Sequence, residues 1–253
     1  MNDLFKLRKT WISSAHQGFV EENIHSNTLA AYMLAARKGA DMIETDARTT
    51  RDGILIVNHD ATVKGFDENL KPVEYLISDT DYADIAKLTL KPDGDRQNRV
   101  PKLSEALHLA YFTGMCINID LKEGAAHAMD VARLVAEHGM RGRTVYATNG
   151  SGAHTINDIL AIDPDARFID TKANYTREQL AEVKDYTAKC FVYTADFSNK
   201  NIAEIRQSGC LLATISLSSA NAKDAFRHHP DMAEYPHTSD FEAIDKEILS
   251  GMI

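Results

Sequence analysis

The sequence contains no long apolar run and no signal-like start. Nowhere do the roughly 18 consecutive apolar residues of a membrane-spanning helix occur. The first ten residues carry charges, but they are not followed by the apolar run of about 7 to 15 residues that a signal peptide requires. We therefore expect no membrane span and a cytoplasmic location.

Basic residues are also in short supply. The chain has 28 Lys and Arg against 37 Asp and Glu, and its formal net charge is -9. A surface of this sign repels nucleic acid and anionic lipid, so neither is expected as the main partner. A phosphate group bound here would need help from a metal ion or from a few well-placed cations.

Cysteine and glycine-rich motifs are scarce as well. The three cysteines, Cys116, Cys190 and Cys210, form no CxxC pair and lie in apolar, strand-like segments. This placement predicts reduced, buried thiols. Gly18 stands alone after the first predicted strand, so the glycine-rich fingerprint of a dinucleotide site is missing. These absences argue against a disulfide scaffold and against a Rossmann-type domain.

What the chain does contain is a regular alternation of short apolar strands and helical segments. Strands are predicted over residues 11–18, 41–49, 116–122, 144–148, 167–171, 190–194, 211–216 and 232–238. Helices follow them at 27–38, 104–113, 125–137, 152–162, from Thr176, and at 199–207, 220–227 and 241–249. Such alternation implies parallel pairing, and eight units in about 250 residues predict an α/β fold, a closed (β/α)8 TIM barrel, as a single domain over residues 1–253.

Two additions to the barrel are expected after its second strand. Asp52 and Gly53 are favoured in a tight turn, and a return strand over residues 54–58 would complete a β-hairpin. Residues 61–100 are rich in Asp, Asn, Pro and Gly, and we expect them to form a small insertion with short helices over the barrel mouth.

Polar side chains gather where the first three predicted strands end. Glu44 and Asp46 lie two apart and therefore share a face, and the hairpin returns His59 toward them. His16 and Asp120 end the first and third strands. A lone histidine or a lone pair of carboxylates is more often structural, but the active sites of such barrels lie at the carboxyl ends of the strands. An all-oxygen ligand set suits Mg²⁺, Ca²⁺ or Mn²⁺, beside acid/base histidines.

Five segments of the first half of the chain form a specific combination. They are residues 15–18 (AHQG), 39–48 (GADMIETDAR), 50–60 (TRDGILIVNHD), 100–105 (VPKLSE) and 118–122 (NIDLK). Together they resemble the glycerophosphodiester phosphodiesterase family, within the barrel superfamily that also contains phosphatidylinositol-specific phospholipase C. Beyond residue 122 the resemblance is mainly topological, with residues 192–195 (VYTA) standing where the family often has W-T-V-N.

The resemblance implies an enzyme, a metal-dependent phosphodiesterase that hydrolyses small glycerophosphodiester-like substrates to an alcohol and a phosphomonoester. Glu44, Asp46 and Asp120 would bind the divalent cation, while His16 and His59 would act as general acid and base on opposite sides of the phosphorus. The residues that would contact the phosphate or support the site are Gln17, Glu22, Arg48, Lys122 and Tyr193. No oligomeric state is implied.

Gln17 departs from the family pattern, which has an arginine at this position. A neutral amide cannot replace a bidentate positive charge, so Arg48 or Lys122 compensates, the substrate differs, or phosphate is bound less tightly. Asp120 replaces a glutamate and shortens one ligand by a methylene. Two alternatives therefore stand beside hydrolysis: a lyase that forms a cyclic phosphate, and a catalytically weak barrel that binds a metal or a phosphorylated ligand.

Overall fold

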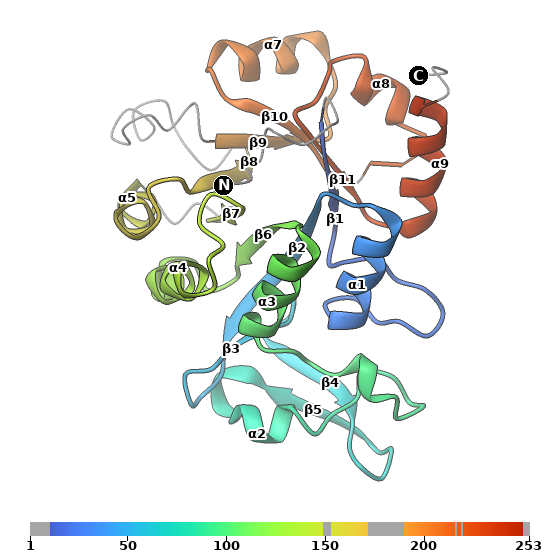
Figure 1. Ribbon diagram of the computed structural model, residues 1–253, viewed down its shortest axis with the longest axis vertical. Coiled ribbons are helices and arrows are strands. Elements are labelled where there is room, and N and C mark those ends of the chain that lie inside the picture. The colour runs from blue at the N-terminus through green and yellow to red at the C-terminus, as the bar shows by residue number, and fades with distance from the viewer. Residues whose placement is uncertain (1–10, 149–152, 172–189, 216, 219, 250–253) are drawn as a thin grey trace.

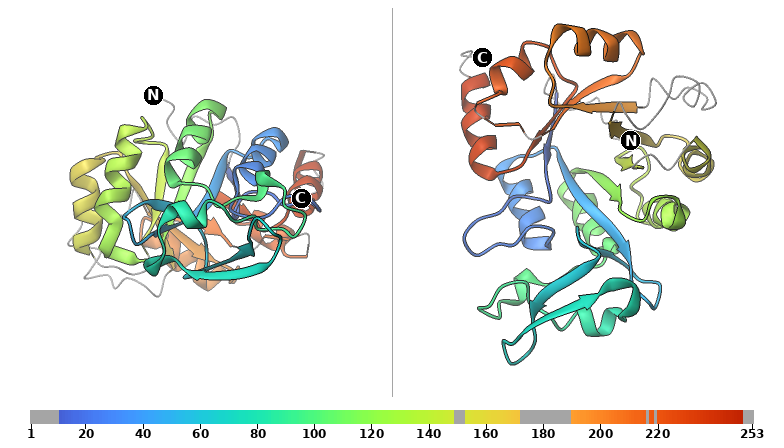
Figure 2. Two further views of the ribbon diagram at one scale, coloured as in Figure 1. Left: turned by 90° about the horizontal axis from the view of Figure 1, so that it is seen from below. Right: turned by 180° about the vertical axis from the view of Figure 1, so that it is seen from behind.

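The structure is a computed structural model that describes residues 11–148, 153–171, 190–215, 217–218 and 220–249. Its main sheet has nine strands, of which eight are parallel and close into a barrel surrounded by helices (Figures 1 and 2). The predicted (β/α)8 TIM barrel is confirmed.

The elements follow the predicted order. The barrel strands are β1 (Ile12–Ala15), β2 (Met42–Thr49), β6 (Cys116–Leu121), β7 (Thr144–Ala147), β8 (Arg167–Thr171), β9 (Cys190–Thr194), β10 (Leu211–Thr214) and β11 (Met232–Tyr235). The helices around them are α1 (Leu29–Lys38), α3 (Leu103–Thr113), α4 (Ala128–Glu137), α5 (Ala153–Ile162), α7 (Asn199–Gln207), α8 (Ala222–Phe226) and α9 (Thr238–Leu249). Strand β1 pairs with both β2 and β11, which closes the ring.

Two of the eight predicted helices differ from the others in their outcome. The helix predicted to start near Thr176 lies outside the described residues. Helix α9 begins at Thr238, three residues before the predicted start at Phe241, because apolar spacing marks the first buried residue of a helix and not its polar first turn. Among the described residues, no helix combines the length and the hydropathy that a membrane span needs.

Helix α1 shows how local chemistry fixes an element that borders the site. The Thr28 hydroxyl accepts a hydrogen bond from the Ala31 amide at 3.2 Å and caps the amino terminus, and Gly39 ends the helix in the left-handed region, at a φ of 88°. Gly18, in the turn after β1, has a φ of 77°, and a Cβ there would lie 2.8 Å from the Ala31 backbone. Only glycine lets this turn pack so closely on α1.

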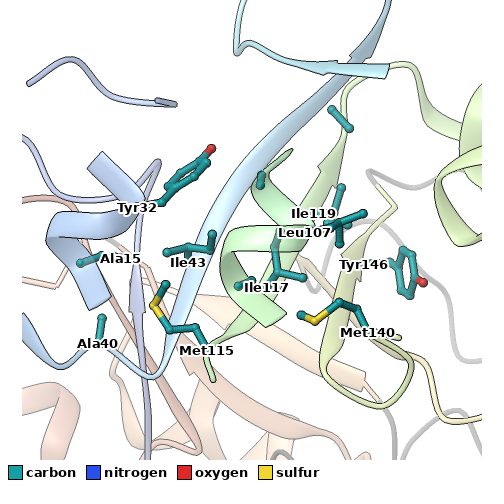
Figure 3. Packing of buried hydrophobic residues seen from close by; sticks show 14 of the residues in the cluster. Ala15, Tyr32, Ala40, Ile43, Leu107, Met115, Ile117, Ile119, Met140 and Tyr146 are labelled. Carbon is teal, nitrogen blue, oxygen red and sulfur yellow. The ribbon is translucent and has the colours of Figure 1, made fainter. Parts of the chain in front are cut away.

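Two layers of apolar side chains stabilise the barrel. The larger layer lies between the strands and the helices, with Ile43, Leu107 and Ile117 among its members (Figure 3). The second receives at least one residue from each of the eight barrel strands, which places it in the barrel interior; it comprises Ile12, Met42, Cys116, Val145, Ala147, Ile169, Phe191, Ala213 and Met232. Ile12, Met42, Cys116 and Met232 are the first residues of their strands, and Val145 and Phe191 are the second. The apolar cluster therefore lies mainly toward the amino-terminal end of the barrel and leaves the carboxyl end for polar residues.

The hairpin predicted after the second strand is present, since β3 (Leu55–Val57) runs antiparallel to β2. The segment 61–100 contains the short helix α2 (Tyr82–Ile85) and two 3-10 turns, η2 (Ile77–Asp79) and η3 (Arg96–Asn98). It also contains a second antiparallel pair, β4 (Thr62–Phe66) and β5 (Pro72–Leu76), which the sequence pattern did not predict. Strand β5 is half-buried on one face, through Val73 and Tyr75, and exposed on the other. It begins with Pro72 and β4 contains Gly65, two residue types that are depleted in strands, so the sequence pattern showed little sign of the pair. A small apolar cluster of its own stabilises this region.

Candidate active site

Three carboxylates meet where β2 and β6 run side by side. In the register of this parallel pair Asp46 lies opposite Asp120, and Glu44 lies two residues earlier on the same face of β2. One oxygen from each of the three lies within 4.8 Å of the others. Glu44 and Asp46 are only 4% and 1% exposed. The structure thus brings together the three residues that the sequence selected, and it buries two of them.

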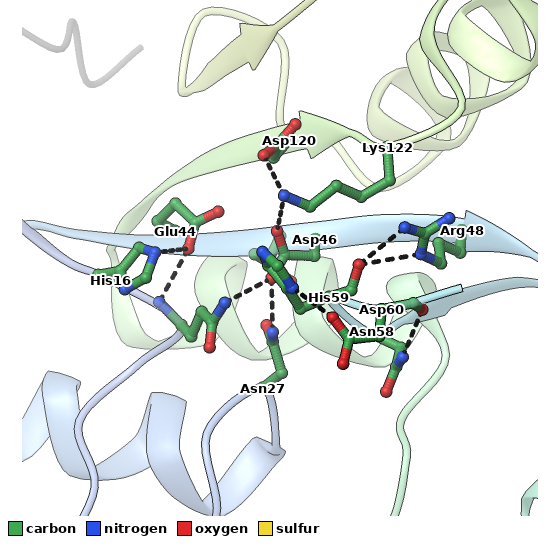
Figure 4. Close-up of polar contacts among 12 residues, drawn as sticks. His16, Asn27, Glu44, Asp46, Arg48, Asn58, His59, Asp60, Asp120 and Lys122 are labelled. Carbon is green, nitrogen blue, oxygen red and sulfur yellow. Dashed lines mark hydrogen bonds and ion pairs between the residues drawn. The ribbon is translucent and has the colours of Figure 1, made fainter. Parts of the chain in front are cut away.

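Asp46 is the centre of a hydrogen-bond network (Figure 4). Its Oδ2 accepts hydrogen bonds from Gln17 Nε2 at 3.0 Å and from Asn27 Nδ2 at 2.6 Å. Its Oδ1 lies 2.9 Å from Lys122 Nζ, which also donates to Asp120 Oδ2 at 2.6 Å. Burial lowers the pKa of Lys122, but its hydrogen bond to Asp120 and the charge of Asp46 outweigh that effect and raise the pKa above its usual value. Lys122 therefore carries a positive charge between two carboxylates.

Glu44 lacks such a partner. Its Oε2 accepts a hydrogen bond from the Gln17 backbone N–H at 2.8 Å and lies 4.0 Å from His16 Nε2. Burial, together with the negative charges of Asp46 and other nearby carboxylates, raises the pKa of Glu44 well above its usual value. Gln17 can serve both carboxylates because its φ of 55° turns the backbone N–H toward Glu44 while the side chain reaches Asp46.

The two candidate histidines differ in their surroundings. Burial lowers the pKa of His16, the charge of Asp46 opposes this, and the positive charge of His59 lowers the pKa further. His16 is therefore neutral near pH 7. His59 has a side chain that is 56% exposed, and its Nδ1 lies 2.8 Å from Asp60 Oδ1. This contact lowers the pKa of Asp60, so an ionised carboxylate orients the His59 ring.

Three further candidates have hydrogen bonds to groups other than the three clustered carboxylates. Arg48 donates from Nε and Nη2 to the backbone oxygen of His59, at 3.0 and 2.8 Å. These bonds connect β2 to the segment that follows β3. Glu22 is exposed, and its backbone oxygen accepts a hydrogen bond from Lys91. The Tyr193 hydroxyl donates to Glu234 and lies 3.3 Å from Asn118 Nδ2. The structure therefore places Tyr193 inside the barrel, where it connects β9, β11 and β6.

Two features of the site were not predicted from the sequence: the buried Glu234 and the hydrogen bond from Asn27 to Asp46. Glu234 is 3% exposed on β11. Burial raises the pKa of Glu234 to about 7, with the Tyr193 hydrogen bond opposing and the charges of Asp120 and Asp46 adding to the shift. A single charged residue inside the short apolar strand Met232–Tyr235 was the available signal, because carboxylates are rarely buried without a reason.

Residues 16–140 match the model of the Glycerophosphoryl diester phosphodiesterase family. Through this segment the chain belongs to that family. A glycerophosphodiester phosphodiesterase from Caldanaerobacter subterraneus subsp. tengcongensis is 34% identical over 113 residues, which cover 44% of this chain and 44% of the relative. The match thus spans less than half the length of the curated relatives.

Solved structures extend the similarity beyond the matched segment. A glycerophosphodiester phosphodiesterase from Agrobacterium tumefaciens superposes with a TM-score of 0.72 at 22% identity, over 92% of this chain and 99% of its own. A phosphodiesterase from Oleispira antarctica, solved in complex with the product sn-glycerol-3-phosphate, gives 0.68 at 16% identity, over 93% and 96%. At these identities the likeness shows a shared barrel fold.

Proposed function

We propose that this protein is a metal-dependent phosphodiesterase that hydrolyses glycerophosphodiester-like substrates to an alcohol and a phosphomonoester. The observation that carries the proposal is the meeting of three carboxylates with a neutral histidine at the carboxyl ends of neighbouring strands. The family match includes all of these residues. The names of the relatives point to the same reaction class.

The carboxylates suit one hard divalent cation. Ligand oxygens lie about 2.0 to 2.6 Å from Mg²⁺ or Ca²⁺, so two ligands of one ion are at most about 4 to 5 Å apart. Glu44, Asp46 and Asp120 meet this limit with oxygens within 4.8 Å of one another. Burial, and after it the negative charges of Asp46 and other carboxylates, raise the pKa of Glu44, and a cation bound here would favour its ionised form. Mg²⁺, Ca²⁺ or Mn²⁺ bound here would polarise a phosphoryl oxygen and stabilise charge that develops on it.

His16 and His59 would move the protons. His16 is neutral near pH 7, so its free ring nitrogen can accept a proton from the attacking water. His59, oriented by Asp60, would donate a proton to the leaving alkoxide. Each such proton transfer contributes about 10²- to 10⁴-fold to the rate.

Lys122 and Gln17 are the phosphate contacts that the geometry favours. Both bind Asp46, so both border the space beside the carboxylates. Lys122 would supply the charge that Gln17 lacks. Arg48, Glu22 and Tyr193 stay candidates for supporting roles, with Arg48 positioning His59 through its backbone oxygen.

We also propose that the chain forms one domain whose insertion at 61–100 covers the barrel mouth. Asn98, at the end of the insertion, donates from Nδ2 to the backbone oxygen of Asn23 at 2.9 Å and accepts from the His25 backbone N–H at 2.7 Å. Asn23 and His25 belong to the loop that follows β1. The insertion is thus attached to a loop at the end of the barrel where the carboxylates lie.

The decisive experiment is turnover of glycerophosphocholine by His16→Ala and His59→Ala, with circular dichroism to verify folding. Each variant should lose about 10²- to 10⁴-fold in kcat. His108→Ala, on the outer surface of α3, is the matched control and should keep its activity. Near-normal rates in both site variants would contradict the proposal. Phosphorus NMR of the product would separate hydrolysis from formation of a cyclic phosphate.

Gln17 supports a second candidate, a catalytically weak barrel that binds a metal or a phosphorylated ligand. Its amide donates to Asp46 where the family has a guanidinium that can bind phosphate. Calorimetry with Mg²⁺ or Ca²⁺ alone, together with a broad panel of phosphodiesters, tests this alternative. Metal binding without any turnover would favour it over hydrolysis.

A further inference from the structure

Two of the three buried thiols are neighbours. Leu211 pairs with Phe191 in the parallel register of β9 and β10, and Cys210 and Cys190 come directly before these two residues. Hydrogen-bonded strands lie about 4.7 to 4.9 Å apart, and disulfides join Cα atoms that are about 4.4 to 6.8 Å apart. The backbones of Cys190 and Cys210 therefore have the spacing that a disulfide needs.

Both side chains point to the same side of the sheet. Cys190 and Cys210 belong to the apolar layer between strands and helices, whereas Phe191 and Ala213 belong to the cluster inside the barrel. Because side chains alternate along a strand, the two thiols face outward together. Cys116 belongs to the interior cluster, so it lies on the opposite side of the sheet from this pair.

The thiols also differ in chemistry. A hydrogen bond from the Cys190 side chain, with a smaller one from Ser208, lowers the pKa of the Cys210 thiol to about 6 in spite of burial. Burial raises the pKa of Cys116 to about 11. At neutral pH Cys210 is therefore mostly thiolate and Cys116 is a thiol, and only a thiolate is a strong nucleophile.

We propose that Cys190 and Cys210 form a dithiol that a hydroperoxide converts into an intramolecular disulfide across β9 and β10. The Cys210 thiolate attacks one peroxide oxygen, the O–O bond breaks, and hydroxide leaves and takes up a proton to become water. The resulting sulfenic acid is attacked by the Cys190 sulfur, which releases a second water. Two thiols are oxidised and one hydrogen peroxide is reduced to two waters.

Burial does not prevent this reaction with a small oxidant. Cys210 is 4% exposed and follows Gly209, which has a φ of 79° in the turn between α7 and β10. Hydrogen peroxide is close to water in size, so a brief local opening of this turn admits it. A bulky oxidant such as oxidised glutathione needs a wider opening and should react more slowly.

The test is stoichiometric hydrogen peroxide on the 253-residue chain at neutral pH, followed by thiol counting after denaturation and by peptide mapping. Free thiols should fall from three to one, with a mass loss of two hydrogens and a dithiothreitol-sensitive Cys190–Cys210 peptide. Cys116 should be oxidised at least about tenfold more slowly, because its thiolate fraction is far smaller. The mapping needs no substitution, so it stands even if a variant fails to fold.

Single substitutions give the matched controls. Cys116→Ser should still form the crosslink, whereas Cys190→Ser should stop at a sulfenic acid on Cys210 that dimedone traps. Three thiols remaining under peroxide that oxidises free cysteine would overturn the proposal. A crosslink through Cys116, or sulfinic acid on Cys210 with Cys190 still reduced, would overturn it as well.

Discussion

The two halves of the barrel have the same architecture but unequal chemistry. Strands β1, β2 and β6 and the loops after them provide both candidate histidines, the three clustered carboxylates and Lys122. In the described part of the second half, Tyr193 and Glu234 interact with these groups. The Tyr193 hydroxyl contacts Asn118 on β6 and donates to Glu234, and the charges of Asp120 and Asp46 act on Glu234. One half of the barrel thus concentrates the reactive groups, while the other supports them from within.

Burying several carboxylates is costly, and in the first half the groups that offset this cost surround Asp46, whereas burial and neighbouring carboxylates raise the pKa of Glu44. Asp46 has three donors, from Gln17, Asn27 and Lys122. An ionised group out of water is stable only when it is hydrogen-bonded or paired with an opposite charge. Glu234, in the second half, has the Tyr193 hydroxyl as its hydrogen-bond donor, and its pKa rises to about 7. The difference lies in the density of donors around each carboxylate.

The largest effect is expected from Asp46→Asn, which removes a charge at the centre of the first half. If Asp46 binds the cation, kcat/KM should fall by about three orders of magnitude or more, since such a cation contributes several kcal/mol of transition-state stabilisation. Steady-state kinetics with saturating Mg²⁺ or Ca²⁺ measure the loss.

The matched control for Asp46→Asn lies in the second half. Asp231 accepts hydrogen bonds from the Leu212 backbone N–H at 2.7 Å and from Arg206 at 2.6 Å, at the amino-terminal end of the barrel. Asp231→Asn should lower the free energy of unfolding and leave kcat/KM unchanged. An equal loss of activity in both variants would break the contrast between the halves.

The pH dependence of stability gives the next largest effect. The folded-state pKa of Glu234 is about 7, above its ordinary value of 4.5, so the fold favours the protonated form. The stabilising contribution of protonated Glu234 is fully present below pH 4.5. It is lost as the pH rises through 7, and the loss in the free energy of unfolding is about 3 kcal/mol for a shift of this size. Glu234→Gln cannot ionise and should lack this loss.

Urea unfolding at pH 4.5 and pH 8, with a chelator present, measures the Glu234 effect. The glutamine side chain can still accept the Tyr193 hydrogen bond, so packing is kept. Parallel pH curves for the two proteins would show that Glu234 ionises as freely in the fold as in the unfolded chain.

The smallest effect is expected from Tyr193→Phe, which removes the hydrogen bonds between the halves. A net hydrogen bond is worth about 1 kcal/mol, so kcat/KM should fall by roughly fivefold. Tyr32→Phe is the matched change in the first half, because the Tyr32 hydroxyl donates to Asn27 Oδ1 at 2.9 Å and Asn27 contacts Asp46. We expect kcat/KM to fall further in Tyr32→Phe than in Tyr193→Phe. The opposite order would contradict the contrast between the two halves.

Sequence reasoning succeeded where the signal was local. The hairpin over residues 41–60 follows from apolar runs on both sides of Asp52-Gly53, and the structure has it as β2 and β3. The same reasoning failed at β4 and β5, since Gly65 and Pro72 are residue types that are depleted in strands and both strands are only five residues long. The hydrogen bond from Asn27 to Asp46 was not predicted either, because it depends on how α1 and the turn before it pack beside β2.

The sequence by itself determined the barrel and the carboxylate group, because strand–helix alternation and the two-residue spacing of Glu44 and Asp46 are read within short segments. Only the tertiary structure decided which distant groups meet. Tyr193 and Glu234 are 41 residues apart and make contact because the barrel brings their strands to a common interior. Cys190 and Cys210 become neighbours through the register of β9 and β10. Closure and register arise from the packing of the whole sheet, and no short stretch of residues encodes them.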